Sequence, residues 1–205
     1  VAAGTTSEGL IDLDTGLHRT GIEPNADAAG LYHNIDETKG LVAGGFHVYD
    51  GHQHQRSRQE REAAIKCQWE KVIDLRDTLT DSGLAVPRMV CGGSGSFPVY
   101  AQMEEPTIEV CPGTIVFNDA GYTGNFPDMM FPPAALLLTR VISRPTADLI
   151  TLDLGIKAVA CDPPAEHRCI FPALPDAELV LHNEEHLVVK TDRAADYQPG
   201  DELMA

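Results

Sequence analysis

Residues 1–118 alternate short apolar runs with longer polar stretches. The connections between the runs are long enough to return the chain from one end of a sheet to the other, which parallel strands require. We therefore expect a parallel sheet with crossover helices, and four such strands make half of an eight-stranded βα barrel. The runs expected as strands are Leu10–Thr15, Leu41–Tyr49, Ala85–Val90 and Thr107–Phe117.

Two of the connections carry clear helix signals. Asn25 is a suitable N-cap for a helix from Ala26 to about Lys39, and Gly40 is a suitable stop. A longer helix is expected from about residue 56 to residue 82, ending before Gly83. A Pro-bounded segment at residues 100–106 predicts a further short helix. The side of the long helix expected to face the core carries Ile65, Trp69, Val72, Ile73, Arg76 and Leu79.

The pattern changes after Asn118. Residues 118–128 are expected to form a loop, and the later runs lack a helical period and are separated by Pro, Asp and Gly turns. We therefore expect a partial barrel domain over residues 1–120 and an antiparallel β domain over residues 121–205. The expected strands of the second domain are Leu136–Ser143, Leu149–Leu154, Ala158–Cys161, Leu179–His182 and Leu187–Thr191.

Composition narrows the classes of partner. A formal net charge of −16 disfavours nucleic acid and anionic membrane surfaces. The chain has no apolar run of about eighteen residues, so no membrane span is expected. Its five cysteines are odd in number and irregularly spaced, which favours a cytoplasmic protein over a disulfide framework.

Candidate chemistry gathers at the carboxyl ends of the four expected strands, where barrels collect their reactive groups. After the third strand comes Cys91-Gly-Gly-Ser-Gly-Ser-Phe-Pro98, hereafter the Gly/Ser loop. Backbone N–H groups and serine hydroxyls in such a loop can wrap a phosphate, although a plain tight turn has the same composition. Its place beside the last strand favours the phosphate site. The other strand ends deliver Asp12, Asp14, His18 and Arg19; His47, Tyr49, Asp50, His52 and His54; and Glu109, Cys111, Asn118 and Asp119.

Two clusters at these ends leave alternatives open. Asp14 and Arg19 form either a guanidinium positioned beside a carboxylate to bind an anionic or ring-nitrogen group, or a salt-bridged loop. His52 and His54 would face the same side of an extended segment, which suits a metal ion. Tyr49 or His52 could instead act as an acid or base, and a solvated polar loop is the third interpretation.

Taken together, the strand-end motifs resemble the D-threonine aldolase and D-serine dehydratase family. These are pyridoxal phosphate enzymes with the fold of alanine racemase (fold type III). The resemblance implies the C-terminal half of a TIM-type (β/α)8 barrel followed by an antiparallel β domain. The matching motifs occur in order over essentially the whole chain: residues 12–21, 49–52, 91–98, 109–119, 152–158 and 182–187.

The resemblance also implies a site. The backbone of Gly92, Gly93 and Ser94 and the hydroxyls of Ser94 and Ser96 would hold the cofactor phosphate. Tyr49 and Arg19 would line the pocket of the cofactor ring, and His52 would do acid–base work near the substrate. Two parts of the family's site have no match in this sequence. The lysine that binds the cofactor is expected before Asp12, and a divalent metal (Mn, Mg or Zn) is expected on residues just after Ala205.

We therefore expect the chain to be the C-terminal half to two-thirds of a longer enzyme, inactive by itself. The implied reaction is retro-aldol cleavage of a D-β-hydroxy amino acid of the D-threonine type to glycine and an aldehyde. The alternatives are D-serine dehydratase-type elimination, a metal-dependent barrel hydrolase using His52 and His54, and a non-catalytic remnant. A small D-amino acid is the expected partner, with no nucleic acid or membrane, and the fold type predicts a homodimer.

Overall fold

The structure, a computed structural model, describes residues 4–205, and residues 1–3 of the first expected domain lie outside this range. Residues 4–116 and 125–129 form one compact unit, and residues 117–124 and 130–205 form a second. The first unit contains a parallel four-stranded sheet in the order β1-β2-β3-β4. Its strands are β1 (Ser7–Asp12), β2 (Leu41–Val48), β3 (Met89–Cys91) and β4 (Ile108–Val110). This confirms the expected parallel sheet of a partial barrel.

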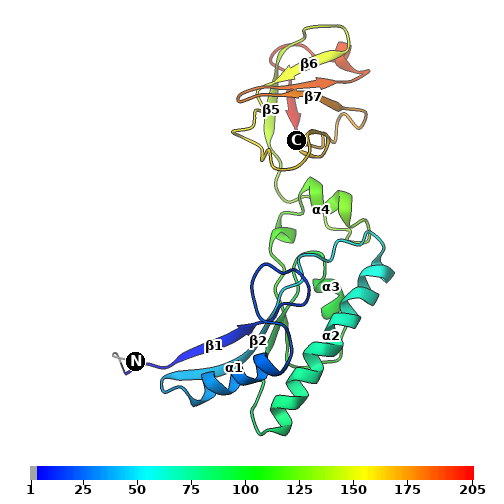
Figure 1. The fold of residues 1–205 in the computed structure, drawn as a ribbon. Helices are drawn as coiled ribbons and strands as arrows, with labels where there is room; N and C mark the ends of the chain where they lie inside the picture. The colour runs from blue at the N-terminus through cyan, green and yellow to red at the C-terminus, as the bar shows by residue number, and fades with distance from the viewer. Residues whose placement is uncertain (1–3) are drawn as a thin grey trace. The chain divides into compact units, whose positions relative to one another are not determined.

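Two long helices make the crossovers. Helix α1 (Ala26–Glu37) begins at the predicted cap, because Asn25 Oδ1 accepts hydrogen bonds from the backbone N–H groups of Asp27 and Ala28. Helix α2 (Arg58–Asp81) begins at Ser57, whose hydroxyl accepts from the Glu60 N–H. Figure 1 shows α1 alongside β1 and β2, with α2 beside α1.

Helix α2 packs on the core of the first unit through its apolar face. Ile65, Val72 and Leu79 are fully buried in the core, as their spacing predicts. Trp69 and Ile73 are partly buried against it. The same face also carries two buried polar side chains, Arg61 and Gln68, which the apolar pattern did not predict.

Three expectations about the middle of the chain are wrong. The short helix expected at residues 100–106 is α3 (Phe97–Tyr100), because Pro98 fits the first turn of a helix. The strand expected over residues 107–117 ends at Val110, because the Pro and Gly of Cys111-Pro-Gly113 interrupt the ladder of hydrogen bonds. A 3₁₀ turn, η1 (Thr114–Val116), follows. The loop expected at 118–128 contains helix α4 (Ala120–Asn125), capped by Asp119, which accepts from the Tyr122 N–H.

The second unit is built on a five-stranded antiparallel sheet in the order β7-β8-β6-β5-β9, as expected for a β domain. The strands are β5 (Leu138–Ser143), β6 (Leu149–Leu152), β7 (Glu178–His182), β8 (Leu187–Lys190) and β9 (Glu202–Met204), with 3₁₀ turns η2 (Ala165–His167) and η3 (Ala194–Asp196).

One predicted strand of this unit is absent and one strand is unpredicted. Residues 158–161 are the end of a turn at residues 156–158 and the irregular segment after it, and the N–H groups of Ala158 and Val159 donate to the Gly155 carbonyl. Strand β9 pairs with β5 instead, and its three residues are too few to give a strand signal in the sequence. Among the described residues, no helix is both long and apolar enough to cross a membrane.

Candidate functional site

The carboxyl ends of β1 and β2 are joined by a histidine–carboxylate pair. Asp12 and His47 are register partners in the parallel ladder, and His47 Nδ1 lies 2.7 Å from Asp12 Oδ1. The Thr20 hydroxyl donates to the other Asp12 oxygen at 2.7 Å. The His47 ring stacks parallel to the Tyr49 ring, with centroids 6.3 Å apart. These contacts fix Tyr49 at the end of β2.

Tyr49 meets groups from two other strand ends. The Arg19 guanidinium lies 4.7 Å from the Tyr49 ring centroid, within the range of a cation–π contact. A side chain on Gly93 would begin 2.9 Å from the Tyr49 ring, so the Gly/Ser loop passes directly against that ring. The structure therefore brings together Arg19, Tyr49 and Gly93, three of the residues predicted for one site.

The expected pairing of Asp14 with Arg19 is wrong. Asp14 Oδ1 accepts from the backbone N–H groups of Gly16 and His18 at 3.0 Å, and its other oxygen lies 2.8 Å from His18 Nδ1. Both carboxylate oxygens of Asp14 therefore have hydrogen-bond partners within four residues, as is common for Asp in a turn. Arg19 is not among these partners. The N–H groups of His18 and Gly16 lower the pKa of Asp14 to about 2. No ion pair of Arg19 occurs in residues 4–205.

The Gly/Ser loop is held in shape by its own serines. Gly92 has φ of +79°, a conformation that glycine adopts without strain. The Ser96 hydroxyl accepts from the Gly93 N–H at 2.9 Å and donates to Asp50 Oδ1 at 2.5 Å. Ser94 Oγ accepts from the N–H groups of Gly113 and Ile115 at 3.3 and 3.1 Å, which ties the loop to the segment after β4.

These bonds decide which groups of the loop could hold an anion. The Ser96 hydroxyl is engaged on both sides and supports the loop from within. The Ser94 hydroxyl accepts two bonds, and across residues 4–205 no acceptor for its proton is found. In the same range, no acceptor is found for the N–H groups of Ser94 and Gly95. The Ser94 hydroxyl with these two N–H groups therefore fits a phosphate.

Behind the loop lies a carboxylate that sequence reasoning placed only as one member of a polar cluster. Asp50 is 1% exposed. Besides the Ser96 hydroxyl, it accepts from Gln68 Nε2 and from the Tyr100 hydroxyl, both at 3.1 Å. Burial raises the pKa of Asp50, while the bonds from Ser96 and Tyr100 oppose the rise. Gln68 lies among buried apolar residues of α2, and this position is the sequence signal that could have revealed a buried polar partner such as Asp50.

The two histidines of the 49–54 segment have different surroundings. His52 is half-buried, with Nε2 3.0 Å from Gln53 Nε2 and Nδ1 buried without a hydrogen-bond partner. His54 is exposed. Among the residues that the structure describes, no three His, Cys, Asp or Glu side chains form a group that could hold a metal ion. The described residues thus give the hydrolase alternative no metal centre.

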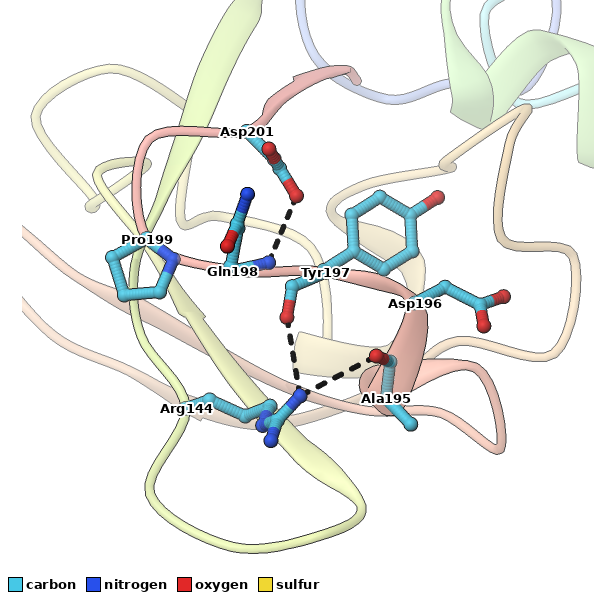
Figure 2. Close-up of a pocket in the computed structure, with 7 residues that line it drawn as sticks. All are labelled: Arg144, Ala195, Asp196, Tyr197, Gln198, Pro199 and Asp201. Carbon is cyan, nitrogen blue, oxygen red and sulfur yellow. Dashed lines mark hydrogen bonds between the residues drawn. The ribbon is translucent and has the colours of Figure 1, made fainter.

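A separate polar pocket of about 510 Å³ lies in the second unit, and Figure 2 shows its lining. Its guanidinium, from Arg144, donates to the carbonyl oxygens of Ala195 and Tyr197 at 3.4 and 3.3 Å. Asp201 accepts from the Gln198 N–H at 2.8 Å. The charged groups of this pocket are therefore used to hold the turn before β9, and the strand-end cluster of the first unit is the better candidate site.

Comparison with known sequences identifies the family of the chain. Residues 1–120 match the profile of the alanine racemase N-terminal domain. The chain belongs to the alanine racemase-like, fold type III family. Within this family, residues 134–205 match a serine dehydratase domain. The family suggested by the strand-end motifs is thereby confirmed.

Individual relatives match most of the chain. It is 30% identical over 200 residues to D-threonine aldolase from Arthrobacter sp, covering 95% of this chain and 51% of the relative. It is 27% identical over 169 residues to 3-hydroxy-D-aspartate aldolase from Paracoccus denitrificans, covering 78% and 43%. The structure of D-threonine aldolase from Filomicrobium marinum matches with a TM-score of 0.89 at 26% identity, covering 99% of this chain and 55% of that one. The chain thus spans about half the length of these relatives.

Proposed function

We propose that the protein acts as a pyridoxal phosphate-dependent lyase that cleaves D-β-hydroxy amino acids of the D-threonine type to glycine and an aldehyde. The observation that carries the proposal is the packing of the Gly/Ser loop against Tyr49, with Arg19 on the same ring. The 30% identity to a D-threonine aldolase over 95% of the chain supports the choice of reaction. Residues 1–120 would supply the cofactor side of the site, and residues 121–205 would form the β domain.

The residues of this chain divide the work as follows. The Ser94 hydroxyl and the N–H groups of Ser94 and Gly95 hold the cofactor phosphate, while Ser96 keeps the loop in shape. Arg19 and Tyr49 line the ring pocket, where the guanidinium supplies positive charge in a chain of net charge −16. His52 holds or moves a proton at an imidazole nitrogen. When bound, pyridoxal phosphate supplies the electron sink that both carbon–carbon cleavage and elimination need.

Two components must come from outside these residues. The five lysines lie at 39, 66, 71, 157 and 190, none of them in the loops directly after the carboxyl ends of β1 to β4. The proposal therefore requires a cofactor lysine elsewhere in the complete gene product. It also requires a divalent metal, which residues of the complete gene product outside residues 4–205 would hold.

The test is a product assay on the complete gene product with pyridoxal phosphate and Mn²⁺. With D-threonine, we expect glycine and acetaldehyde in equal amounts, no reaction with L-threonine, and loss of activity in EDTA that Mn²⁺ restores. Ammonia and a keto acid in place of glycine would move the assignment to the dehydratase reaction. A folded protein that binds no pyridoxal phosphate would overturn the proposal. Light scattering of the same sample tests the proposed homodimer.

A further inference from the structure

The buried Asp50 is connected to His52 by two glutamine side chains. Gln68 Nε2 donates to Asp50 Oδ2 at 3.1 Å, and Gln68 Oε1 accepts from Gln53 Nε2 at 2.8 Å. Gln53 Nε2 lies 3.0 Å from His52 Nε2. Asp50, Gln53 and Gln68 are all at most 7% exposed, so water does not compete for these bonds.

The order of donors and acceptors along this connection follows from its chemistry. Asp50 Oδ1 accepts from the Ser96 hydroxyl and Asp50 Oδ2 accepts from the Tyr100 hydroxyl, so the carboxyl group serves as an acceptor. The amide nitrogen of Gln68 therefore faces Asp50 and its oxygen faces Gln53. Gln53 then turns its nitrogen to Gln68, an orientation that Gln55 reinforces by donating to Gln53 Oε1 at 2.9 Å. An amide nitrogen facing an imidazole nitrogen must donate to it. His52 Nε2 is therefore the acceptor, and the ring proton of neutral His52 is on Nδ1.

We propose that Asp50, Gln68 and Gln53 are positioning residues that fix the tautomer of His52, so that its Nδ1–H is the group offered to a ligand. His52 Nδ1 is buried and has no hydrogen-bond partner in residues 4–205. This is expected of a donor whose partner is a bound molecule. The tautomer is a property of this chain alone. Its catalytic use rests on the proposed function, where His52 does the proton work.

The tautomer can be measured by nitrogen NMR of the complete gene product labelled with ¹⁵N-histidine, recorded in mildly alkaline solution so that the neutral ring is observed. The His52 signals are identified by their loss in His52→Asn. In the native protein we expect Nδ1 in the protonated range and Nε2 in the unprotonated range. A protonated Nε2 would overturn the proposal.

Two variants test the connection. Gln53→Glu presents only acceptors to His52 Nε2, so we expect the proton to move to Nε2. Gln68→Met removes the link to Asp50. The loss of the hydrogen bond from Gln53 Nε2 to Gln68 Oε1, which orients Gln53, is expected to change the tautomer ratio about fivefold. The matched control is Gln59→Met, the same change at an exposed position of α2, which should leave the ratio unaltered. An unaltered ratio in a folded Gln68→Met protein would overturn the role of Asp50.

If Gln68→Met does not fold, the proposal is tested by the tautomer of the native protein and by its change in Gln53→Glu. A protein with the predicted tautomer that binds no pyridoxal phosphate would overturn the proposed function alone.

Discussion

The Ser96 hydroxyl lies 2.5 Å from Asp50 Oδ1, a bond that ties the Gly/Ser loop after β3 to the buried carboxylate after β2. The same hydroxyl accepts from the Gly93 N–H, the glycine that packs against Tyr49. One side chain therefore sets both the shape of the loop and its distance from the ring pocket. The loop's serines have separate tasks, with Ser96 turned inward and Ser94 available to a ligand.

Removal of the Ser96 hydroxyl should cost stability. Ser96→Ala leaves the Gly93 N–H without a partner and removes one of the three side-chain hydrogen bonds to the buried Asp50. An unsatisfied buried group of this kind costs about 1–3 kcal/mol. Urea unfolding measures the change. Ser82→Ala, which removes a hydroxyl at the exposed end of α2, should change the free energy of unfolding by about 0.5 kcal/mol or less. Equal effects of the two variants would contradict the anchoring role of Ser96.

Gly92 should not tolerate a side chain. Its φ of +79° disfavours other residues by about 1–2 kcal/mol, and a Cβ would lie 2.9 Å from both Ser96 Oγ and the Tyr100 ring. Gly92→Ala should lower the free energy of unfolding by at least this amount and weaken binding of pyridoxal phosphate. The control is Gly9→Ala in β1, where a Cβ meets no atom within 4 Å. A Gly92→Ala protein as stable as this control would refute the described loop geometry.

The fully buried Arg61 should be a major determinant of stability. It pairs with Asp128 at 2.5 Å, donates to the Gln55 carbonyl at 2.7 Å and lies 4.8 Å from the Phe126 ring centroid. Arg61→Ala removes the partner of a largely buried carboxylate, which costs about 3–5 kcal/mol. Arg58→Ala breaks the partly exposed pair with Glu62 one turn earlier and should cost about 0.5 kcal/mol. Thermal unfolding of both variants measures the contrast.

Asp14 should contribute to the pH dependence of stability. Its pKa falls from 3.8 to about 2 on folding, so the native state binds this proton less readily than the unfolded state. The contribution is present above about pH 4 and is lost as the pH falls towards 2. Relative to Asp14→Asn, the native protein should lose about 1 kcal/mol across this window. Parallel stability curves for the two proteins between pH 2 and 4 would contradict the assignment.

The sequence predicted the elements whose signals are local. Asn25 caps α1 as expected, and the apolar spacing of Ile65, Val72 and Leu79 located the buried face of α2. It failed where a partner decides the structure. The strand expected at 158–161 is absent because its first two N–H groups bond to the Gly155 carbonyl, and β9 exists because β5 supplies an edge.

The site divides in the same way. Arg19, Tyr49 and Gly93 come together because they follow neighbouring parallel strands, which strand order predicts. The pairing of Asp14 with His18 depends on one local turn, and five-residue spacing from Arg19 could not exclude it. The burial of Asp50 depends on Gln68 and Tyr100, which lie 18 and 50 residues away along the chain and bear no pattern that links them to it.

The central claim is that the Gly/Ser loop holds the phosphate of pyridoxal phosphate, and a comparison of two ligands tests it directly. The complete gene product is titrated with pyridoxal phosphate and with pyridoxal, which lacks the phosphate, and binding is followed by absorbance. The native protein should prefer pyridoxal phosphate by about 100-fold, as two or three charge-assisted hydrogen bonds would give. Gly93→Val should remove most of this preference, and Gly9→Val should keep it. A folded Gly93→Val protein with the native preference would contradict the claim.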